Sequence, residues 1–204
     1  MERRVDEVFG YFCNSGSEAA QEARLNYWCP FLNSKCIKRS RLVDNPVGTC
    51  SVRFGEKRVL ICPERFRQDN IVMGAIADHY FHSRDNLMVF EEISLPEVGR
   101  FDHVMVKHKP LSQEIEDFIV VEFQGGETTS TGKLIRSFKE CMAGDSVEGK
   151  DYAFGLNMAD IWKRTFTQVL TKGMVMESWG QKIYWVVQEP VYQDFLNRYN
   201  LHGM

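Results

Sequence analysis

The run DFIVVEFQ at residues 117–124 is the sequence feature that most constrains the fold of this chain. It is apolar at almost every position, as expected of a central strand that is covered on both faces. Glu122 lies inside the run and Gln124 follows two positions later, so their side chains point to the same face. Because a buried carboxylate is costly unless it is paired or bound to a metal, Glu122 is a candidate functional residue.

The rest of the chain shows alternating strand and helix patterns. Residues 5–12 place Val5, Val8, Phe9 and Phe12 at helical spacing, which predicts a helix there. Ser15 followed by Glu18 resembles a capping box and predicts a second helix through Trp28. TCSVRF and KRVLIC, separated by Gly55-Glu56, predict a β-hairpin.

Beyond residue 70 the predicted elements form one series. The series begins with a helix, which is followed by three strand-like runs. Two helices, a fourth strand and a last helix opened by Pro190 come after them. The helices are expected at 70–81, 131–142 and 158–177, and the strands at 86–95, 100–108, 117–124 and 181–188. This order predicts an α/β fold, with a mixed β-sheet flanked by helices.

The length of 204 residues fits one compact domain with a small appended lobe. We expect N-terminal helices over 1–28, a basic cysteine-rich lobe over 29–67 and the main α/β core over 68–204. No apolar run reaches the roughly 18 residues that a bilayer span requires. The N-terminus MERRVDEVFGYF carries acids and lacks the long apolar stretch of a signal peptide, so we expect a cytoplasmic protein.

The charge distribution points to a phosphate-bearing partner, although the net charge is −3. A basic lobe joined to an acidic body suits a protein that approaches phosphates with one face. The alternative is an ordinary solvated surface. Within residues 35–67 three acids stand against nine basic residues: Lys35, Lys38, Arg39, Arg41, Arg53, Lys57, Arg58, Arg65 and Arg67.

A second carboxylate precedes the central strand. Asp102 lies between apolar residues of the run RFDHVMVKH, twenty positions before Glu122. Two acids on neighbouring strands repel each other, and a hard divalent cation with oxygen ligands turns that repulsion into a binding site. Mg²⁺ in such a site activates water and holds a phosphodiester oxygen. The alternative is that Glu122 is an edge-strand acid facing solvent.

These residues match the Asp…Glu-x-Lys pattern of the PD-(D/E)XK nucleases, except that Gln124 occupies the lysine position. Glu92, in the strand before Asp102, is a third candidate for the metal shell. Its neighbour Glu91 faces the other way, and periodicity does not decide which of the two points inward. His103 and His108 flank the strand of Asp102 and are expected on the surface.

The chain has six cysteines, and disulfides are not expected in a cytoplasmic protein. Cys29, Cys36, Cys50 and Cys62 fall within 34 residues, which suggests a tetrahedral site for structural Zn²⁺ or a single Fe ion. Four buried free thiols are the alternative. Cys13 and Cys141 are left over, and Cys141 is expected to be a buried core thiol.

Three sequence segments together resemble the NotI-type restriction endonucleases, type II enzymes of the PD-(D/E)XK superfamily. They are CPFL at 29–32 with the later cysteines, Phe101-Asp102 with Glu122 to Gln124, and KRTFTQ at 163–168. The family also has glutamine at the position of Gln124, and Glu92 fits its Glu-apolar-Ser-apolar strand. This chain is much shorter than the family's namesake, so the resemblance implies no particular recognition sequence.

The resemblance implies a Mg²⁺-dependent endonuclease that cleaves double-stranded DNA to 5′-phosphate ends. Asp102, Glu122 and the carbonyl of Phe123 would bind Mg²⁺, Gln124 would orient the attacking water, and Glu92 would complete the metal shell. The family's cysteine lobe holds a single iron and helps to contact DNA. Cleavage of both strands of a palindrome implies a homodimer, in a bacterial or phage-encoded enzyme.

The residues expected to contact DNA lie in the basic lobe and on the helix over 158–177. They are Lys38, Arg39, Arg41, Lys163 and Arg164. On that helix Trp162 and Phe166 are expected in the core. Two other functions stay open: a metal-stabilised DNA-binding module without catalysis, and a low-specificity DNase subunit of a defence or repair system.

Overall fold

A computed structural model describes residues 1–201 of the chain. The chain forms two compact units, each assembled from separated stretches of sequence. Unit 1 contains Met1–Gln68, Gly125–Met158 and residues 188–201, and unit 2 contains Asp69–Gln124 and Ala159–Val187. The predicted break at residue 67 lies beside the first of these boundaries. Residues 1–28 lie in unit 1 together with residues 29–67, and residues 69–201 are distributed over both units.

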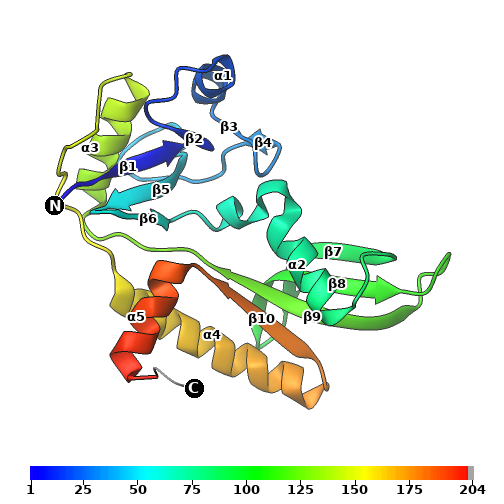
Figure 1. The fold of residues 1–204 in the computed structure, drawn as a ribbon. Coiled ribbons are helices and arrows are strands. Elements are labelled where there is room, and N and C mark those ends of the chain that lie inside the picture. Colours follow the sequence, from blue (N-terminus) through cyan, green and yellow to red (C-terminus); the bar gives the residue numbers. More distant parts are fainter. Residues whose placement is uncertain (202–204) are drawn as a thin grey trace. The chain divides into compact units, whose positions relative to one another are not determined.

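Unit 1 is built on a four-stranded antiparallel sheet in the order β2-β1-β5-β6 (Figure 1). Its strands are β1 (Arg3–Val8), β2 (Tyr11–Phe12), β5 (Thr49–Phe54) and β6 (Lys57–Leu60). The predicted hairpin is confirmed, because β5 and β6 pair directly across the turn at Gly55.

The predicted helix over residues 5–12 is wrong. These residues lie in β1 and β2, joined by a tight turn in which Phe9 and Gly10 have positive φ angles of 51° and 85°. The register of β1 against β5 shifts on both sides of Glu7. A bulged strand does not alternate strictly, so its apolar residues fell at a spacing that imitates a helix.

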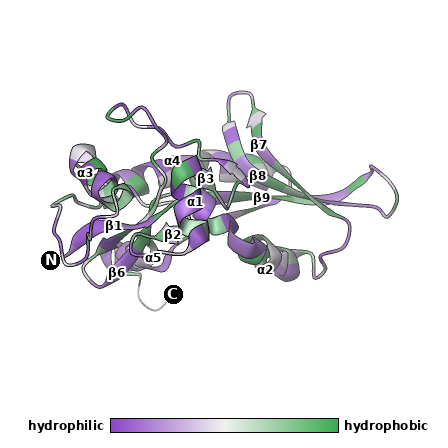
Figure 2. Ribbon diagram, turned by 90° about the horizontal axis from the view of Figure 1, so that it is seen from above, coloured by the Kyte–Doolittle hydropathy of each residue, from purple (hydrophilic) through white to green (hydrophobic). Residues whose placement is uncertain are grey.

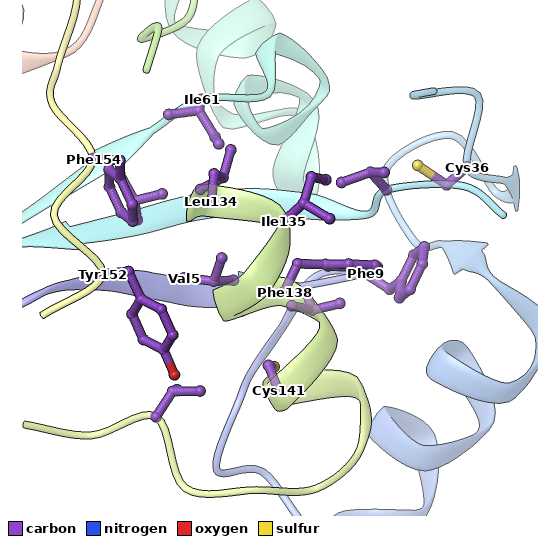
Figure 3. Packing of buried hydrophobic residues seen from close by; sticks show 14 of the residues in the cluster. Val5, Phe9, Cys36, Ile61, Leu134, Ile135, Phe138, Cys141, Tyr152 and Phe154 are labelled. Atoms are coloured by element: carbon purple, nitrogen blue, oxygen red, sulfur yellow. The ribbon is translucent and has the colours of Figure 1, made fainter. Parts of the chain in front are cut away.

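Helix α3 (Thr131–Met142) covers one face of this sheet and closes the core of unit 1. Leu134, Ile135 and Phe138 of α3 lie beside Val5 and Phe9 in Figure 3. The helix carries both hydrophobic and hydrophilic residues along its length (Figure 2), as an amphipathic helix must. Ser137 also ties it to β1, since its hydroxyl accepts a 2.9 Å hydrogen bond from the Val5 amide.

The other elements of unit 1 are short. They include α1 (Glu18–Asn26), β3 (Trp28–Cys29), β4 (Ser34–Lys35) and α5 (Glu189–Tyr199), while the 3-10 helix Pro63–Asn70 leads out of the unit. The helix after residue 15 is confirmed, although Ser17 and not Ser15 caps it by accepting a hydrogen bond from Ala20.

Cys13 and Cys141 form a disulfide, with their Cα atoms 5.4 Å apart. This contradicts the expectation of unpaired thiols, in which Cys141 was a buried core residue. The two cysteines are 128 positions apart in the chain and meet because α3 packs against the N-terminal strands. The bond therefore adds a covalent link to the packing of α3.

Unit 2 contains the predicted mixed sheet, in the order β10-β9-β8-β7 (Figure 1). Strands β7 (Leu87–Leu95), β8 (Gly99–His108) and β9 (Ile115–Gln124) are antiparallel neighbours, and β10 (Lys182–Val187) runs parallel to β9. All four strands are confirmed, and residues 119–123 of β9 are buried, as its apolar sequence predicts.

Two helices cover opposite faces of this sheet. Tyr184 and Trp185 are adjacent on β10, so their side chains point to opposite faces. Tyr184 contacts His79 of α2 (Ile71–Tyr80), and Trp185 contacts Trp162 of α4 (Met158–Ser178). The predicted mixed α/β fold is thus confirmed, with α4 on the face of the sheet that includes Trp185.

Phe154 provides a test of how unit 1 is assembled, since it is fully buried in the core next to residues of β1 and α3. We expect Phe154→Ala to lower the free energy of unfolding by about 3–5 kcal/mol, because it opens a cavity that the core cannot fill. Leu25→Ala is the control, since Leu25 is 79% exposed and should change the stability by less than about 0.5 kcal/mol. Urea denaturation followed by tryptophan fluorescence measures both, and equal stabilities for the two variants would contradict this core.

Candidate active site

The side chains of Glu122 and Gln124 lie on one face of β9, two residues apart. Helix α4 packs on that face and presents Thr165 and Lys172, which are seven residues, or two helical turns, apart. The hydroxyl of Thr165 donates to Oε1 of Gln124 at 3.0 Å, and the ammonium group of Lys172 donates to Oε2 of Glu122 at 2.6 Å. Strand and helix therefore face each other with two polar pairs.

Asp102 meets Glu122 at the point where the hydrogen-bonded ladder between β8 and β9 ends. The last regular pair of that ladder is His103 with Val121. Beyond it, the Asp102 amide donates to Oε1 of Glu122 at 3.3 Å, and the Phe123 amide donates to Oδ2 of Asp102 at 2.9 Å. Each carboxylate thus takes a backbone donor from the other strand, and the two acids are fixed side by side.

Glu122 is the most buried acid of this group, with 6% of its side chain exposed. Burial raises the pKa of its carboxyl, and the negative charge of Asp102 raises it further. The hydrogen bonds from Lys172 and from the Asp102 amide act in the opposite direction. The site therefore holds two neighbouring carboxylates and only one buried cation.

This donor set fits a magnesium ion. Mg²⁺ prefers oxygen ligands, keeps several waters and needs only one or two protein carboxylates. Asp102 and Glu122 supply these, and the Phe123 carbonyl lies on the same strand. Within residues 1–201 no three histidine, cysteine, aspartate or glutamate side chains are grouped to hold a metal, so any ion here would depend on two carboxylates.

Glu92 is not brought into this group. It is exposed on β7, its φ angle is 56°, and its carboxylate is paired with the guanidinium group of Arg100. The regular pairing of β7 with β8 skips Glu92, between the Glu91–His103 and Ile93–Phe101 pairs. Its proposed role as a third metal ligand is therefore not supported by this geometry.

The predicted DNA-contacting residues differ in their exposure. Arg39 and Arg41 of unit 1 and Lys163 and Arg164 of α4 are exposed. Lys38 is partly buried, and its ammonium group donates to the backbone carbonyls of Thr49 and Ile61, both at 3.3 Å. Lys38 is thus engaged in the structure of unit 1, whereas the other four lie at the surface.

Part of the basic charge predicted at residues 35–67 is neutralised within unit 1. Asp6 of β1 is buried and accepts hydrogen bonds from Arg4 and Arg58 at 2.7 and 2.6 Å, with Arg53 at 3.8 Å. Glu7 pairs with Arg65 at 3.3 Å. The excess of positive charge in the sequence therefore overstates what this surface offers to a phosphate.

Cys29, Cys36 and Cys50 are buried free thiols, and Cys62 is half-buried. Burial raises the pKa values of Cys36, Cys50 and Cys62, and neighbouring thiols of the same set raise them further. This mutual effect places the four sulfurs in one region. The Gly10 amide donates to Sγ of Cys50 at 3.3 Å, and that thiol donates to the Gly48 carbonyl at 3.4 Å.

The thiols as arranged do not form a metal-holding group among the described residues. Iron and zinc bind deprotonated thiolates, and burial raises the pKa of three of these thiols, an effect that the charge of a bound ion would oppose. The clustering predicted for the cysteines is present, but a bound iron or zinc is not supported by this arrangement.

Sequence reasoning missed Thr165 and Lys172 and misjudged several neighbours. Trp162 is buried as expected, but Phe166 is 45% exposed, and His103, expected at the surface, is buried against Phe123. One signal was available: Lys172 falls in line with Ile161, Thr165 and Met176, the buried stripe of α4. A lysine in a buried stripe points to a specific partner.

Comparison with known proteins gives the family of the chain. None of the helices in residues 1–201 combines the length and apolar character that a membrane span needs. No curated protein was found to match the chain. The family model described as "Restriction endonuclease NotI" matches residues 8–200. Because this match covers nearly the whole chain, the chain belongs to the NotI restriction endonuclease family.

Proposed function

We propose that this chain is a Mg²⁺-dependent endonuclease that cleaves double-stranded DNA at a specific sequence and leaves 5′-phosphate ends. Membership of the family implies a site-specific DNA endonuclease. The observation that carries the finer proposal is the cross-strand pairing of Asp102 with Glu122, with Gln124 on the same strand. Adjacent carboxylates held by backbone amides are the arrangement that a hard cation requires.

The residues divide the work between holding a metal and orienting water. Asp102, Glu122 and the Phe123 carbonyl would hold Mg²⁺, which when bound supplies positive charge to the phosphodiester and activates a water molecule. Thr165 donates to Oε1 of Gln124 and so fixes which end of that amide faces α4. A fixed amide can orient the attacking water, which is the role proposed for Gln124.

Double-stranded DNA is the proposed partner, and a homodimer is the proposed assembly. Two active sites related by a dyad would cut both strands of a palindromic site. Arg39, Arg41, Lys163 and Arg164 are exposed and suited to phosphate contacts. Lys38 is better assigned to supporting the cysteine region, because its ammonium group is held by two backbone carbonyls.

A plasmid and phage DNA digest tests the proposed function most directly. We expect discrete fragments with Mg²⁺ and no cleavage with EDTA, and sequenced ends should carry 5′-phosphates at one common sequence. A smear of fragments would instead indicate a low-specificity DNase. Retained DNA binding with no cleavage under any metal would indicate a binding module and contradict the proposal.

Charge removal at the carboxylates tests the site itself. Asp102→Asn can still accept the hydrogen bond from the Phe123 amide but loses its charge, so we expect cleavage to fall by about 10³-fold. DNA binding measured with Ca²⁺ in place of Mg²⁺ should change little.

Glu92→Gln provides the matched comparison to Asp102→Asn. Since Glu92 is exposed and paired with Arg100, the geometry predicts an effect on cleavage of less than about threefold, equal to less than 1 kcal/mol. If Glu92→Gln abolished cleavage as completely as Asp102→Asn, Glu92 would have to join the site in the working enzyme. Full activity of Asp102→Asn would exclude the assigned site.

The cysteine region carries a separate proposal, that Cys29, Cys36, Cys50 and Cys62 hold one structural Fe or Zn ion. The clustering of the four sulfurs supports it, whereas their present arrangement as buried thiols does not. Elemental analysis of the purified protein should find about one tightly bound ion per chain, and Cys36→Ser should lose it. A content of less than half an ion per chain, with an unchanged melting temperature after chelation, would contradict the metal site. The four cysteines would then be free thiols.

A further inference from the structure

Lys172 is the one buried lysine among the described residues, with 4% of its surface exposed. Lysine is almost never fully buried unless it is paired, because removing an ammonium group from water is costly. The buried face of α4 that includes Lys172 is otherwise largely apolar, with Ile161, Trp162 and Met176. An apolar residue at position 172 would fit that face at lower cost, so the lysine is explained by what its ammonium group contacts.

That ammonium group is directed at Glu122. It donates to Oε2 at 2.6 Å and lies 5.4 Å from the centre of the Phe101 ring. The other oxygen of the carboxylate, Oε1, accepts from the Asp102 amide. Because both oxygens have partners, the Glu122 side chain is held in one orientation. One of the two hydrogen bonds that hold it comes from Lys172 of α4.

The location of this cation matters because position 124 is a glutamine. In the Asp…Glu-x-Lys pattern a lysine two residues after the glutamate brings a positive charge to this face of the strand. Gln124 cannot do so, and it is turned towards Thr165 of α4. Lys172 lies two turns beyond Thr165 on the same helix and brings an ammonium group to Glu122 on this face of the strand.

We propose that Lys172 is a positioning residue for the cleavage reaction: it supplies from α4 the cation that position 124 lacks and holds Glu122 in its working orientation. This inference rests on the proposed function of Asp102 and Glu122. The competing explanation is a purely structural ion pair that fastens α4 to the sheet. The two differ in what happens to Glu122 and the neighbouring Asp102 amide when the cation is removed.

The test uses the whole protein carrying Lys172→Met, which keeps the length of the side chain and removes its charge. Amide hydrogen exchange in metal-free protein reports the position of Glu122, because the Asp102 amide is protected by Oε1 of that residue. We expect the Asp102 amide to exchange roughly tenfold faster, as befits the loss of one hydrogen bond. The Met105 amide, further along β8, is the control within the sheet of unit 2, and the Val52 amide of β5 is the reference in unit 1. The ratio of the exchange rates of these two amides should not change.

Kinetics give the second measurement. If Lys172 acts through Glu122, kcat should fall about 100-fold, since misplacement of a reacting group by about 1 Å has effects of that size. The KM for DNA should change less than about twofold, because Lys172 is buried and contacts no DNA. Lys172→Arg should recover at least part of kcat, and Lys139→Met, at an exposed site on α3, should match the unaltered protein.

The outcomes separate the two explanations. Asp102 exchange that rises no more than that of Met105, or an unchanged kcat in the folded variant, would overturn the positioning role and leave a structural ion pair. If the unaltered protein cuts no DNA, the proposed function fails, yet the exchange experiment still decides whether Lys172 orients Glu122. Failure of the inference and failure of the proposed function are thus told apart.

Discussion

The arrangement of unit 2 depends on keeping the carboxylate of Glu122 inside a buried strand. An isolated buried charge would destabilise the sheet by several kcal/mol, so the surrounding elements must supply partners. The backbone of β8 supplies one through the Asp102 amide, and α4 supplies the other through Lys172. Both the register of β8 and the face that α4 presents to the sheet are therefore tied to a single residue. Both oxygens of Glu122 therefore have protein partners without any ligand, as the proposed hydrolytic site would require.

The end of the β8–β9 ladder explains how two acids tolerate each other's proximity. Like charges placed opposite each other on neighbouring strands are destabilising when neither side chain has a hydrogen-bond donor from the protein. Beyond the His103–Val121 pair the backbone amides of Asp102 and Phe123 no longer bond to carbonyls across the ladder and donate to the carboxylates instead. The interruption of the sheet thus creates the site, since it releases the donors that stabilise negative charge. Burial raises the pKa of Glu122 and the charge of Asp102 raises it further, and a divalent cation would relieve that repulsion.

Local patterns made the strands of unit 2 predictable from the sequence, and the approach of Asp102 to Glu122 followed from placing them on neighbouring strands. The helix expected over 5–12 failed because a bulge near Glu7 shifts the apolar spacing, an effect that depends on the partner strand β5. The Cys13–Cys141 disulfide required knowing that α3 packs on β1. Thr165 and Lys172 escaped notice for the same reason: whether a helical residue is buried depends on the element it meets. What could not be predicted was therefore tertiary contact, not local conformation.

The same dependence on tertiary contact applies to charge. Residues 35–67 carry a large positive excess in the sequence, but Asp6 and Glu7, outside that stretch, come to lie beside Arg53, Arg58 and Arg65. These arginines therefore offer less positive charge to a phosphate than their number implies, because the neighbouring buried carboxylates neutralise part of it. Exposed cations such as Arg39 and Arg41 offer the larger gain from releasing counterions. Affinity for DNA in this region should follow the exposed residues and not the count of basic ones.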